Sequence, residues 1–417
     1  MSTTFDRRDF LKTAGATLTL LLSERGLTAA QTPAQEASVG APVGFAVIGL
    51  GSWGRDILTT LGRMPGARVE MICDTYEPFI KRSTASAPRA VTVTDFRRVL
   101  EASPVEAVVI ATPTPTHKDI VAACLSAGKH VYCEAPLAST SEDARAVADA
   151  AARFPKQVFQ AGLQGRANSL YRHVSQFVKS GVLGDVALVN AQWSKKESWR
   201  RAAPTPERER ELNWRLADGS PGLMGEIGIH QIDLIAQYLG GYPNAITGFG
   251  SLVAWNDTRR VPDTAVCLMD VGRARVNYRA TLASSFGNAY TVFQGSNSSL
   301  LMKEAQSWLI KESDSALLGW EVYARKEKVH DETGIAMVAD ATKLLEAGKE
   351  PGKDASGPEK PALLLAFESF IRSIREGRPS VCGAREGFRA TVAALKANQA
   401  VINGNRIEVA PAEYDIA

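Results

Sequence analysis

The chain has 417 residues, of which 45% are hydrophobic and 22% charged, so it can bury a large core, and its length fits two domains with additional segments. The formal net charge of +3 is small and scattered along the chain, which argues against a nucleic-acid or membrane-surface partner. No run of about 18 apolar residues is present, so we expect no membrane span.

Residues 1–40 are predicted to be an export signal and linker outside the fold. Residues 6–12 read Asp-Arg-Arg-Asp-Phe-Leu-Lys, as in a twin-arginine motif, and a mildly apolar stretch at 13–22 precedes small residues at 28–30 that offer a cleavage site. The alternative is a disordered basic tail. The motif predicts recognition by the twin-arginine export machinery and a periplasmic or otherwise exported location.

A glycine-rich turn follows the apolar run 45–48 and precedes a helical pattern. It consists of Gly49, Leu50, Gly51, Ser52, Trp53 and Gly54. A strand, a Gly-x-Gly-x-x-Gly turn and a helix let the backbone approach a pyrophosphate and direct helix N–H groups at its negative charge. The turn predicts a dinucleotide site, the alternative being a glycine-rich turn of an ordinary α/β domain.

Asp74 ends a second apolar strand, residues 68–73, roughly 20 residues after the glycines, where a ribose diol would bind. Its carboxylate would repel the 2′-phosphate of NADP, so Asp74 favours NAD. Lys81 and Arg82 keep NADP as an alternative.

Helices and strands then alternate. We expect helices at 78–86, 95–102, 118–127 and 141–153, and strands at 90–93, 107–113 and 130–134. This order predicts an α/β Rossmann domain with a doubly wound parallel sheet over residues 43–165. Ligands bind beyond the carboxyl ends of such strands. Further cofactor-binding residues are therefore expected at Thr112, Pro113, Thr114, His117, Glu134 and Gln164.

A second domain, residues 166–417, is predicted for substrate binding and oligomerisation. Strands are expected at 186–192, 245–255, 265–271, 274–283 and 290–294, a solvated linker at 343–360, and helices at 225–239, 361–376 and 384–403. Five cysteines show no metal-binding spacing, so we expect free, packed thiols and no metal, with Cys382 nearest the surface.

Several motifs in this order resemble those of the glucose-fructose oxidoreductase, inositol dehydrogenase and rhizopine-catabolism family (Gfo/Idh/MocA). They are Gly49 to Gly54, Asp74, residues 111–117, residues 128–136 and residues 225–233. The resemblance implies NAD(P)-linked chemistry on a sugar, polyol or similar carbonyl compound. It also implies an α+β C-terminal domain with a large open mixed sheet, whose exposed face commonly makes dimers or tetramers.

Two residues depart from the family pattern. Ala135 stands where members usually have the lysine of Glu-Lys-Pro, which manages the proton of the reacting hydroxyl, and Glu226 stands where they usually have aspartate. Of the implied catalytic Lys, Asp and His, only His230 is retained.

His230 is the candidate base, because the pKa of imidazole suits proton removal near neutral pH. In a helix, Glu226 at i−4 would share its face and orient the ring, and Asp233 at i+3 would hold the ring or a sugar hydroxyl. The alternative is a buried structural helix with a satisfied histidine.

Aromatic and basic side chains follow the strand 186–192 in a pattern that suits a sugar-binding site, where rings stack on sugar faces and cations bond hydroxyl groups. The alternative is a solvated charged loop. The substrate-binding candidates are Lys195, Lys196, Trp199 and Arg200, together with Arg166, Tyr171 and Trp214 of the segment 213–215.

Three functions remain open. The first is an exported oxidoreductase that moves hydride from a sugar, polyol or glycoside hydroxyl to NAD. The second is a redox-neutral glycosidase that oxidises, eliminates, adds water and reduces again, and the third is an inactive dinucleotide-binding module. Because an exported enzyme meets little free NAD, the first two require a tightly held cofactor that is recycled on the protein.

Overall fold

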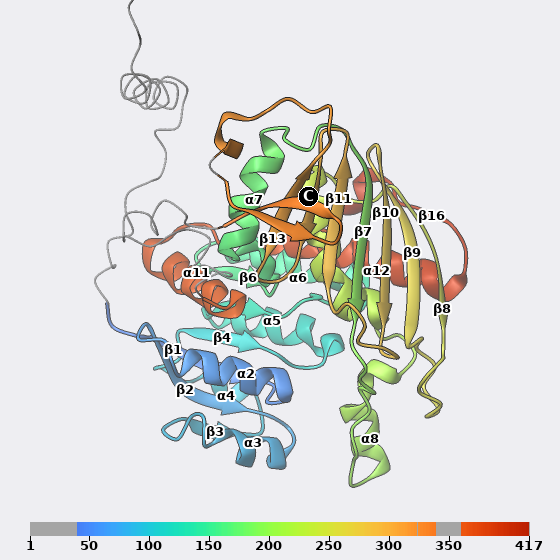
Figure 1. Ribbon diagram of the computed structural model, residues 1–417. Helices are drawn as coiled ribbons and strands as arrows, with labels where there is room; N and C mark the ends of the chain where they lie inside the picture. The colour runs from blue at the N-terminus through green and yellow to red at the C-terminus, as the bar shows by residue number, and fades with distance from the viewer. Residues whose placement is uncertain (1–39, 323, 339–359, 417) are drawn as a thin grey trace, which may run out of the picture. The chain divides into compact units, whose positions relative to one another are not determined.

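The apolar run Val43–Ile48 forms β1, which is buried along its whole length at the centre of a six-stranded sheet. All strands of this sheet are parallel, in the order β3-β2-β1-β4-β5-β6. The other strands are β2 (Ala67–Cys73), β3 (Val91–Val93), β4 (Ala107–Ile110), β5 (His130–Cys133) and β6 (Phe159–Ala161). The computed structural model describes residues 40–322, 324–338 and 360–416 (Figure 1). The predicted doubly wound Rossmann sheet is confirmed.

Short helices connect these strands. They are α2 (Ser52–Leu61), α3 (Glu77–Ser83), α4 (Arg97–Leu100), η1 (Thr114–Thr116), α5 (His117–Ser126) and α6 (Ser141–Arg153). β4 ends at Ile110, earlier than predicted, because Pro113 and Pro115 cannot donate to the ladder and a 3₁₀ turn begins at Thr114. The sequence pattern missed β6, which has only three residues.

A ten-stranded mixed sheet forms the core of the second domain, in the order β14-β15-β13-β12-β11-β7-β10-β9-β8-β16. Its strands are β7 (Val186–Ser194), β8 (Ala245–Ser251), β9 (Thr264–Val271), β10 (Ala274–Thr281), β11 (Tyr290–Gly295), β12 (Ser298–Met302), β13 (Ser307–Lys311), β14 (Lys326–Val329), β15 (Glu332–Ala336) and β16 (Ile407–Glu408). Only the β7–β10 pair is parallel among the described strands of this sheet. The expected open mixed sheet is confirmed.

The predicted strand 245–255 is too long by four residues. β8 stops at Ser251, because the buried carboxylate of Asp263 accepts hydrogen bonds from the backbone N–H groups of Val253, Ala254 and Trp255 and turns the chain away. The strands β12 to β15 were not predicted. Most of the expected linker 343–360 and all of the expected signal lie outside the described residues.

Helices and turns of the second domain line both sheets. They are η2 (Gln164–Arg166), α7 (Ser169–Lys179), α8 (Pro206–Leu212), η3 (Trp214–Leu216), η4 (Met224–Gly228), α9 (Ile229–Leu239), η5 (Gly319–Val322), α11 (Ala362–Glu376), α12 (Ala384–Asn403) and η6 (Pro411–Tyr414). Although α11 follows β15 in sequence, it lies beside the first sheet (Figure 1). Its Phe367 and Phe370 pack on Phe45 and Tyr132 of that sheet.

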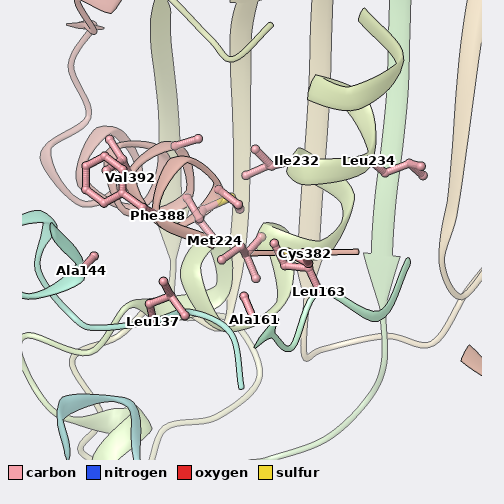
Figure 2. Packing of buried hydrophobic residues seen from close by; sticks show 14 of the residues in the cluster. Leu137, Ala144, Ala161, Leu163, Met224, Ile232, Leu234, Cys382, Phe388 and Val392 are labelled. Atoms are coloured by element: carbon pink, nitrogen blue, oxygen red, sulfur yellow. The ribbon is translucent and has the colours of Figure 1, made fainter. Parts of the chain in front are cut away.

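One apolar core runs between the two sheets (Figure 2). Phe388 and Val392 of α12 meet Met224 of η4 in it. At Gly387 a Cβ atom would lie 2.7 Å from the Cβ of Ala161, so glycine permits α12 to lie directly on β6. This packing connects the Rossmann sheet with the segment that carries the catalytic candidates.

All five cysteines are free and buried. The prediction that Cys382 lies near the surface is wrong. Its carbonyl accepts a hydrogen bond from the N–H of Ala161, so the segment lies along β6, and its side chain is 1% exposed. None of the helices in the described ranges is both long and apolar enough to cross a membrane.

Candidate active site and cofactor site

The glycines of the first turn have distinct roles. Gly49 has φ +94°, and a Cβ atom there would lie 2.5 Å from the backbone of Ala111; at Gly54 it would lie 1.9 Å from the carbonyl oxygen of Gly49. At Gly51 a Cβ atom would meet open space. The first and third glycines thus close the turn, while the second leaves room beside the N-terminus of α2 for a pyrophosphate.

Asp74 lies immediately after β2 and faces this turn. Its carboxylate accepts hydrogen bonds from the backbone N–H of Leu50 at 2.7 Å and of Tyr76 at 2.8 Å. Burial raises the pKa of Asp74, whereas the two N–H groups and the charge of Arg208 act in the opposite direction. The acid is therefore held at the turn, in the position that the ribose of a dinucleotide requires.

His117 cross-links the loops that follow β4 and β5. Its ring nitrogens lie 3.0 Å from the carbonyl oxygens of Pro136 and Thr112, and the side chain is buried. Burial lowers its pKa to about 4. The structure places His117 beneath the loops as a support, while Thr112 and Pro113 remain partly accessible at the carboxyl edge of the sheet.

Glu134 follows β5 at the same edge. Its side chain is 8% exposed, burial raises its pKa to about 7, and a hydrogen bond from the Trp53 side chain acts in the opposite direction. Oε1 has no hydrogen-bond partner among the described residues. A carboxyl group that titrates near neutrality thus lies beside the glycine-rich turn, and Trp53 itself is 39% exposed.

The helix predicted at 225–239 begins with a π turn. Met224–Gly228 forms η4, and regular α-helix starts at Ile229. A Cβ atom at Gly225 would lie 2.3 Å from the Cβ of Pro221, and one at Gly228 would lie 3.1 Å from the Tyr278 ring, so both glycines permit this packing. Because a π turn is wider than an α turn, Glu226 is not stacked on His230 as a straight helix predicts.

Glu226 instead joins the two domains. Its Oε1 accepts a hydrogen bond from Thr114 Oγ1 at 2.9 Å, and its Oε2 accepts one from Arg215 Nε at 2.8 Å. The carboxylate is buried, while the Arg215 side chain is 40% exposed. The acid expected to orient His230 therefore anchors the segment that carries His230 to the loop after β4.

His230 is the second residue of α9 and is solvent-exposed. Burial nevertheless lowers its pKa, with the charge of Asp233 acting in the opposite direction. The surrounding protein thus disfavours the charged form of an accessible imidazole, and the neutral form is the one that a base requires.

Asp233 is fully engaged and buried. Arg166 binds it through two hydrogen bonds of 2.9 and 2.7 Å, and the side chains of Gln237 and Tyr242 each donate one at 3.0 Å. Four donors already occupy the two carboxylate oxygens of Asp233. The predicted hydrogen bond between Asp233 and a sugar hydroxyl is therefore not favoured. Arg166, also expected to bind substrate, thus holds η2 to α9.

Of the predicted substrate residues, the structure brings Trp199 and Trp214 together with Arg215. The guanidinium lies 4.6 Å from the Trp214 ring and 5.8 Å from the Trp199 ring. Trp199 has φ +62°, a strained conformation for a non-glycine residue. This aromatic pair surrounds the cation that binds Glu226 and lies near the catalytic candidates.

The remaining candidates lie in other environments. Lys195 pairs with Glu197 at 2.8 Å, Lys196 is exposed, and Arg200 binds Asp257 and Glu209. Gln164 and Tyr171 lie at the domain junction, where Tyr171 packs against Gly165.

Sequence reasoning missed Arg201, which donates a hydrogen bond to Ser52 at 2.9 Å across 149 positions, because no local pattern distinguishes it from Arg200. Among the described residues, no cluster of His, Cys, Asp and Glu is suited to hold a metal ion.

Two profiles of one family match the chain in succession, namely the oxidoreductase family with an NAD-binding Rossmann fold at residues 43–162, and the GFO/IDH/MocA C-terminal domain at residues 171–301. The chain belongs to the Gfo/Idh/MocA family. The NAD-binding fold covers the glycine turn, Asp74 and Glu134, and the C-terminal profile covers Glu226 and His230.

Known proteins of related sequence include inositol 2-dehydrogenase of Rhodococcus erythropolis, 35% identical over 147 residues, which are 35% of this chain and 42% of the relative. The 2,7-anhydro-N-acetylneuraminate hydratase of Mediterraneibacter gnavus is 26% identical over 215 residues, 51% of this chain and 53% of the relative. The chain spans about half the length of the curated relatives it matches.

Solved structures share the whole Gfo/Idh/MocA fold. Levoglucosan dehydrogenase in complex with NADH and levoglucosan superposes with a TM-score of 0.70 at 17% identity, over 88% of this chain and 99% of that one. At this identity the match shows the fold alone.

Proposed function

We propose that this protein is an NAD-dependent oxidoreductase that acts on a hydroxyl group of a sugar, polyol or glycoside, with His230 as the base. The observation that carries the proposal is the buried hydrogen bond from Thr114 to Glu226, 2.9 Å long. It joins the cofactor edge of the Rossmann sheet to the turn that bears His230. The related inositol 2-dehydrogenase supports this class of substrate.

NAD fits the residues present, since Gly51 leaves space at the N-terminus of α2 and Asp74 lies where a ribose diol binds. When bound, NAD accepts the hydride from the carbinol carbon. His230 takes the hydroxyl proton as the carbon–hydrogen bond breaks, and its lowered pKa keeps it neutral and able to do so.

Arg215 is the cation that we assign in place of the lysine missing at Ala135. A guanidinium stays protonated at neutral pH, so Arg215 neither gives nor takes a proton. Its positive charge stabilises the negative charge that develops on the substrate oxygen. Three contacts hold the partly exposed Arg215 side chain in place. Glu226 accepts a hydrogen bond from its Nε, and the rings of Trp199 and Trp214 flank its guanidinium group.

A redox-neutral reaction is the second candidate, because one relative is named as a hydratase. The same residues serve it, since oxidation of a ring hydroxyl acidifies the neighbouring carbon–hydrogen bond before a group is expelled and water is added. The hydride returns to the sugar at the end, so the net change is hydrolysis or hydration.

We also propose that the protein is exported through the twin-arginine route. The twin-arginine motif at residues 6–12 supports this proposal. A reporter fused behind residues 1–40 is expected outside the cytoplasm. The pair Arg7→Lys and Arg8→Lys is expected to retain the reporter inside, and unchanged export of that variant would contradict the assignment.

The outer face of the ten-stranded sheet is the oligomer interface that we propose. Leu188, Phe249, Val266 and Leu268 are 48%, 71%, 42% and 54% exposed, and Phe249 is paired directly with Val266 across β8 and β9. Phe249, Val266 and Leu268 therefore form an apolar patch on β8 and β9, which Arg275 and Arg279 of β10 separate from Leu188 of β7. An exposed apolar patch of this kind favours self-association into a dimer or tetramer.

The test of the proposed function uses the folded protein without residues 1–40. Mass spectrometry of the released nucleotide identifies NAD or NADP, and nicotinamide absorbance and sugar release are followed together over free sugars and glycosides. We expect a free sugar or polyol to cause lasting reduction of the bound nicotinamide. Sugar release from a glycoside without net reduction would favour the redox-neutral reaction, and absence of any bound nucleotide would contradict both.

A further inference from the structure

Residues 199–212, here called the strap, leave the ten-stranded sheet after β7 and contact the cofactor side of the Rossmann domain. Figure 1 shows α8, the helical end of the strap, standing apart from the ten-stranded sheet. Two arginines of the strap reach the first domain. Arg201 donates to Ser52 Oγ at 2.9 Å, and Arg208 donates to the carbonyl oxygen of Thr75 at 3.0 Å.

The Arg201 contact lies at the N-terminus of α2, a ten-residue helix that follows the glycine turn. Arg55, in the first turn of that helix, has a buried Nη1 without a hydrogen-bond partner among the described residues. Burial lowers the pKa of Arg201, and the charges of Arg215 and Arg55 lower it further. Several positively charged guanidinium groups thus lie close to the N-terminus of a helix, whose N–H groups also favour negative charge. A bound anion would reduce the repulsion between these guanidinium groups.

The base of the strap is held rigidly. Arg200 binds Asp257 at 3.0 Å and Glu209 at 2.6 Å, and Asp257 is bound in turn by the buried Arg259. Arg200 is thus engaged within the second domain, whereas Arg201, the next residue, is the one that reaches Ser52. The side chain of Asn213 accepts a hydrogen bond from the Arg201 backbone N–H and donates one to its carbonyl oxygen, which holds this orientation.

The far end of the strap lies over the residues after β2. The Arg208 guanidinium is 5.5 Å from the centre of the Tyr76 ring, and its charge acts on Asp74. Arg208 therefore lies at the ribose end of the site, while Arg201 lies at the glycine turn. The two contacts mark the two ends of the path that an adenosine diphosphate moiety follows on a Rossmann domain.

We propose that the strap is a clamp of the second domain on the cofactor, in which Arg201, with Arg55, binds the pyrophosphate and Arg208 holds the strap closed over the adenosine ribose. The inference rests on the proposed function, because it assumes that the anion is the pyrophosphate of NAD. Such a clamp would keep the cofactor bound through the export that we propose, since release of the dinucleotide would require the strap to open.

The test measures binding to protein freed of nucleotide, without turnover, by calorimetry. The probes are NADH and ADP-ribose, which contains the pyrophosphate but no nicotinamide. Arg201→Ala is expected to raise Kd for both probes by roughly 10- to 100-fold, because a charge-assisted hydrogen bond is lost. Arg201→Lys is expected to recover part of the affinity. Arg210→Ala, on the exposed side of α8, is the matched control and should bind both probes as the unaltered protein does.

Release rates test closure of the strap separately. Arg208→Ala is expected to speed dissociation of NADH, measured by displacement with excess ADP-ribose, with circular dichroism unchanged.

The outcomes separate this inference from the proposed function. If the unaltered protein binds neither probe, the proposed function fails. If the unaltered protein binds NADH and Arg201→Ala keeps the same Kd and release rate, the clamp is wrong while the function stands. A variant that binds ADP-ribose normally but loses affinity only for the sugar would instead assign Arg201 to an acidic substrate and overturn the clamp.

Discussion

Glu134 shows how one side chain responds to its place beside the cofactor site. Its pKa of about 7 in the folded protein exceeds the ordinary value of 4.5, because burial disfavours the carboxylate. The folded state therefore binds a proton more tightly than the unfolded chain. Protonation of Glu134 therefore contributes to the free energy of unfolding. This contribution is fully present below pH 4.5 and is lost as the pH rises through 7.

Glu134→Gln removes this dependence. The variant stays neutral, so its free energy of unfolding, relative to that of the unaltered protein, is expected to rise by up to about 3 kcal/mol from acid to neutral pH. Denaturant unfolding of the nucleotide-free protein at a series of pH values measures it. Glu332→Gln, at an exposed glutamate of β15, is the control. Parallel pH profiles for Glu134→Gln and the unaltered protein would show that Glu134 titrates normally.

At the scale of the element, the π turn η4 decides what Glu226 contacts. The turn depends on Gly225, where a Cβ atom would lie 2.3 Å from Pro221. Gly225→Ala is therefore expected to destabilise the protein by about 1–3 kcal/mol, as overpacking does, and to reduce turnover. Thermal unfolding and activity measure the two effects. Gly241→Ala is the control, since a Cβ atom there meets nothing within 4 Å; equal stability of the two variants would refute the role of Gly225.

Local signals in the sequence were sufficient for the first sheet, for the glycine turn and for Asp74, because a parallel strand buried on both faces is a continuous apolar run. The π turn was not predicted, because the close approaches at Gly225 and Gly228, the latter to Tyr278 of a distant strand, leave no mark in the helical spacing of the sequence. For the same reason Asp233 was misjudged. The four donors to its carboxylate come from η2, from α9 and from the loop after α9. Helical spacing places only Gln237 near Asp233, so the other donors could not be predicted from it.

At the scale of the whole molecule, the exposed sheet face predicts self-association. Phe249→Glu would place a carboxylate in the apolar patch opposite Val266, where self-association would bury it, so this variant is expected to convert the oligomer to a monomer of 44.8 kDa. Light scattering after size exclusion measures the mass. Leu317→Glu, at a leucine that is 77% exposed and outside the sheet strands, is the control. An unaltered protein that already runs as a monomer would contradict the interface.

The central claim is that His230 removes the hydroxyl proton while NAD takes the hydride, and rapid-mixing reduction of the bound nicotinamide tests it most directly. With the substrate found in the screen, His230→Asn is expected to slow reduction by roughly 10²- to 10⁴-fold, because a positioned base is lost, with Kd for NADH unchanged. In the unaltered protein the rate should rise with pH and level off below the ordinary pKa of histidine, since burial lowers the pKa of His230. Reduction by His230→Asn at the unaltered rate would contradict the claim.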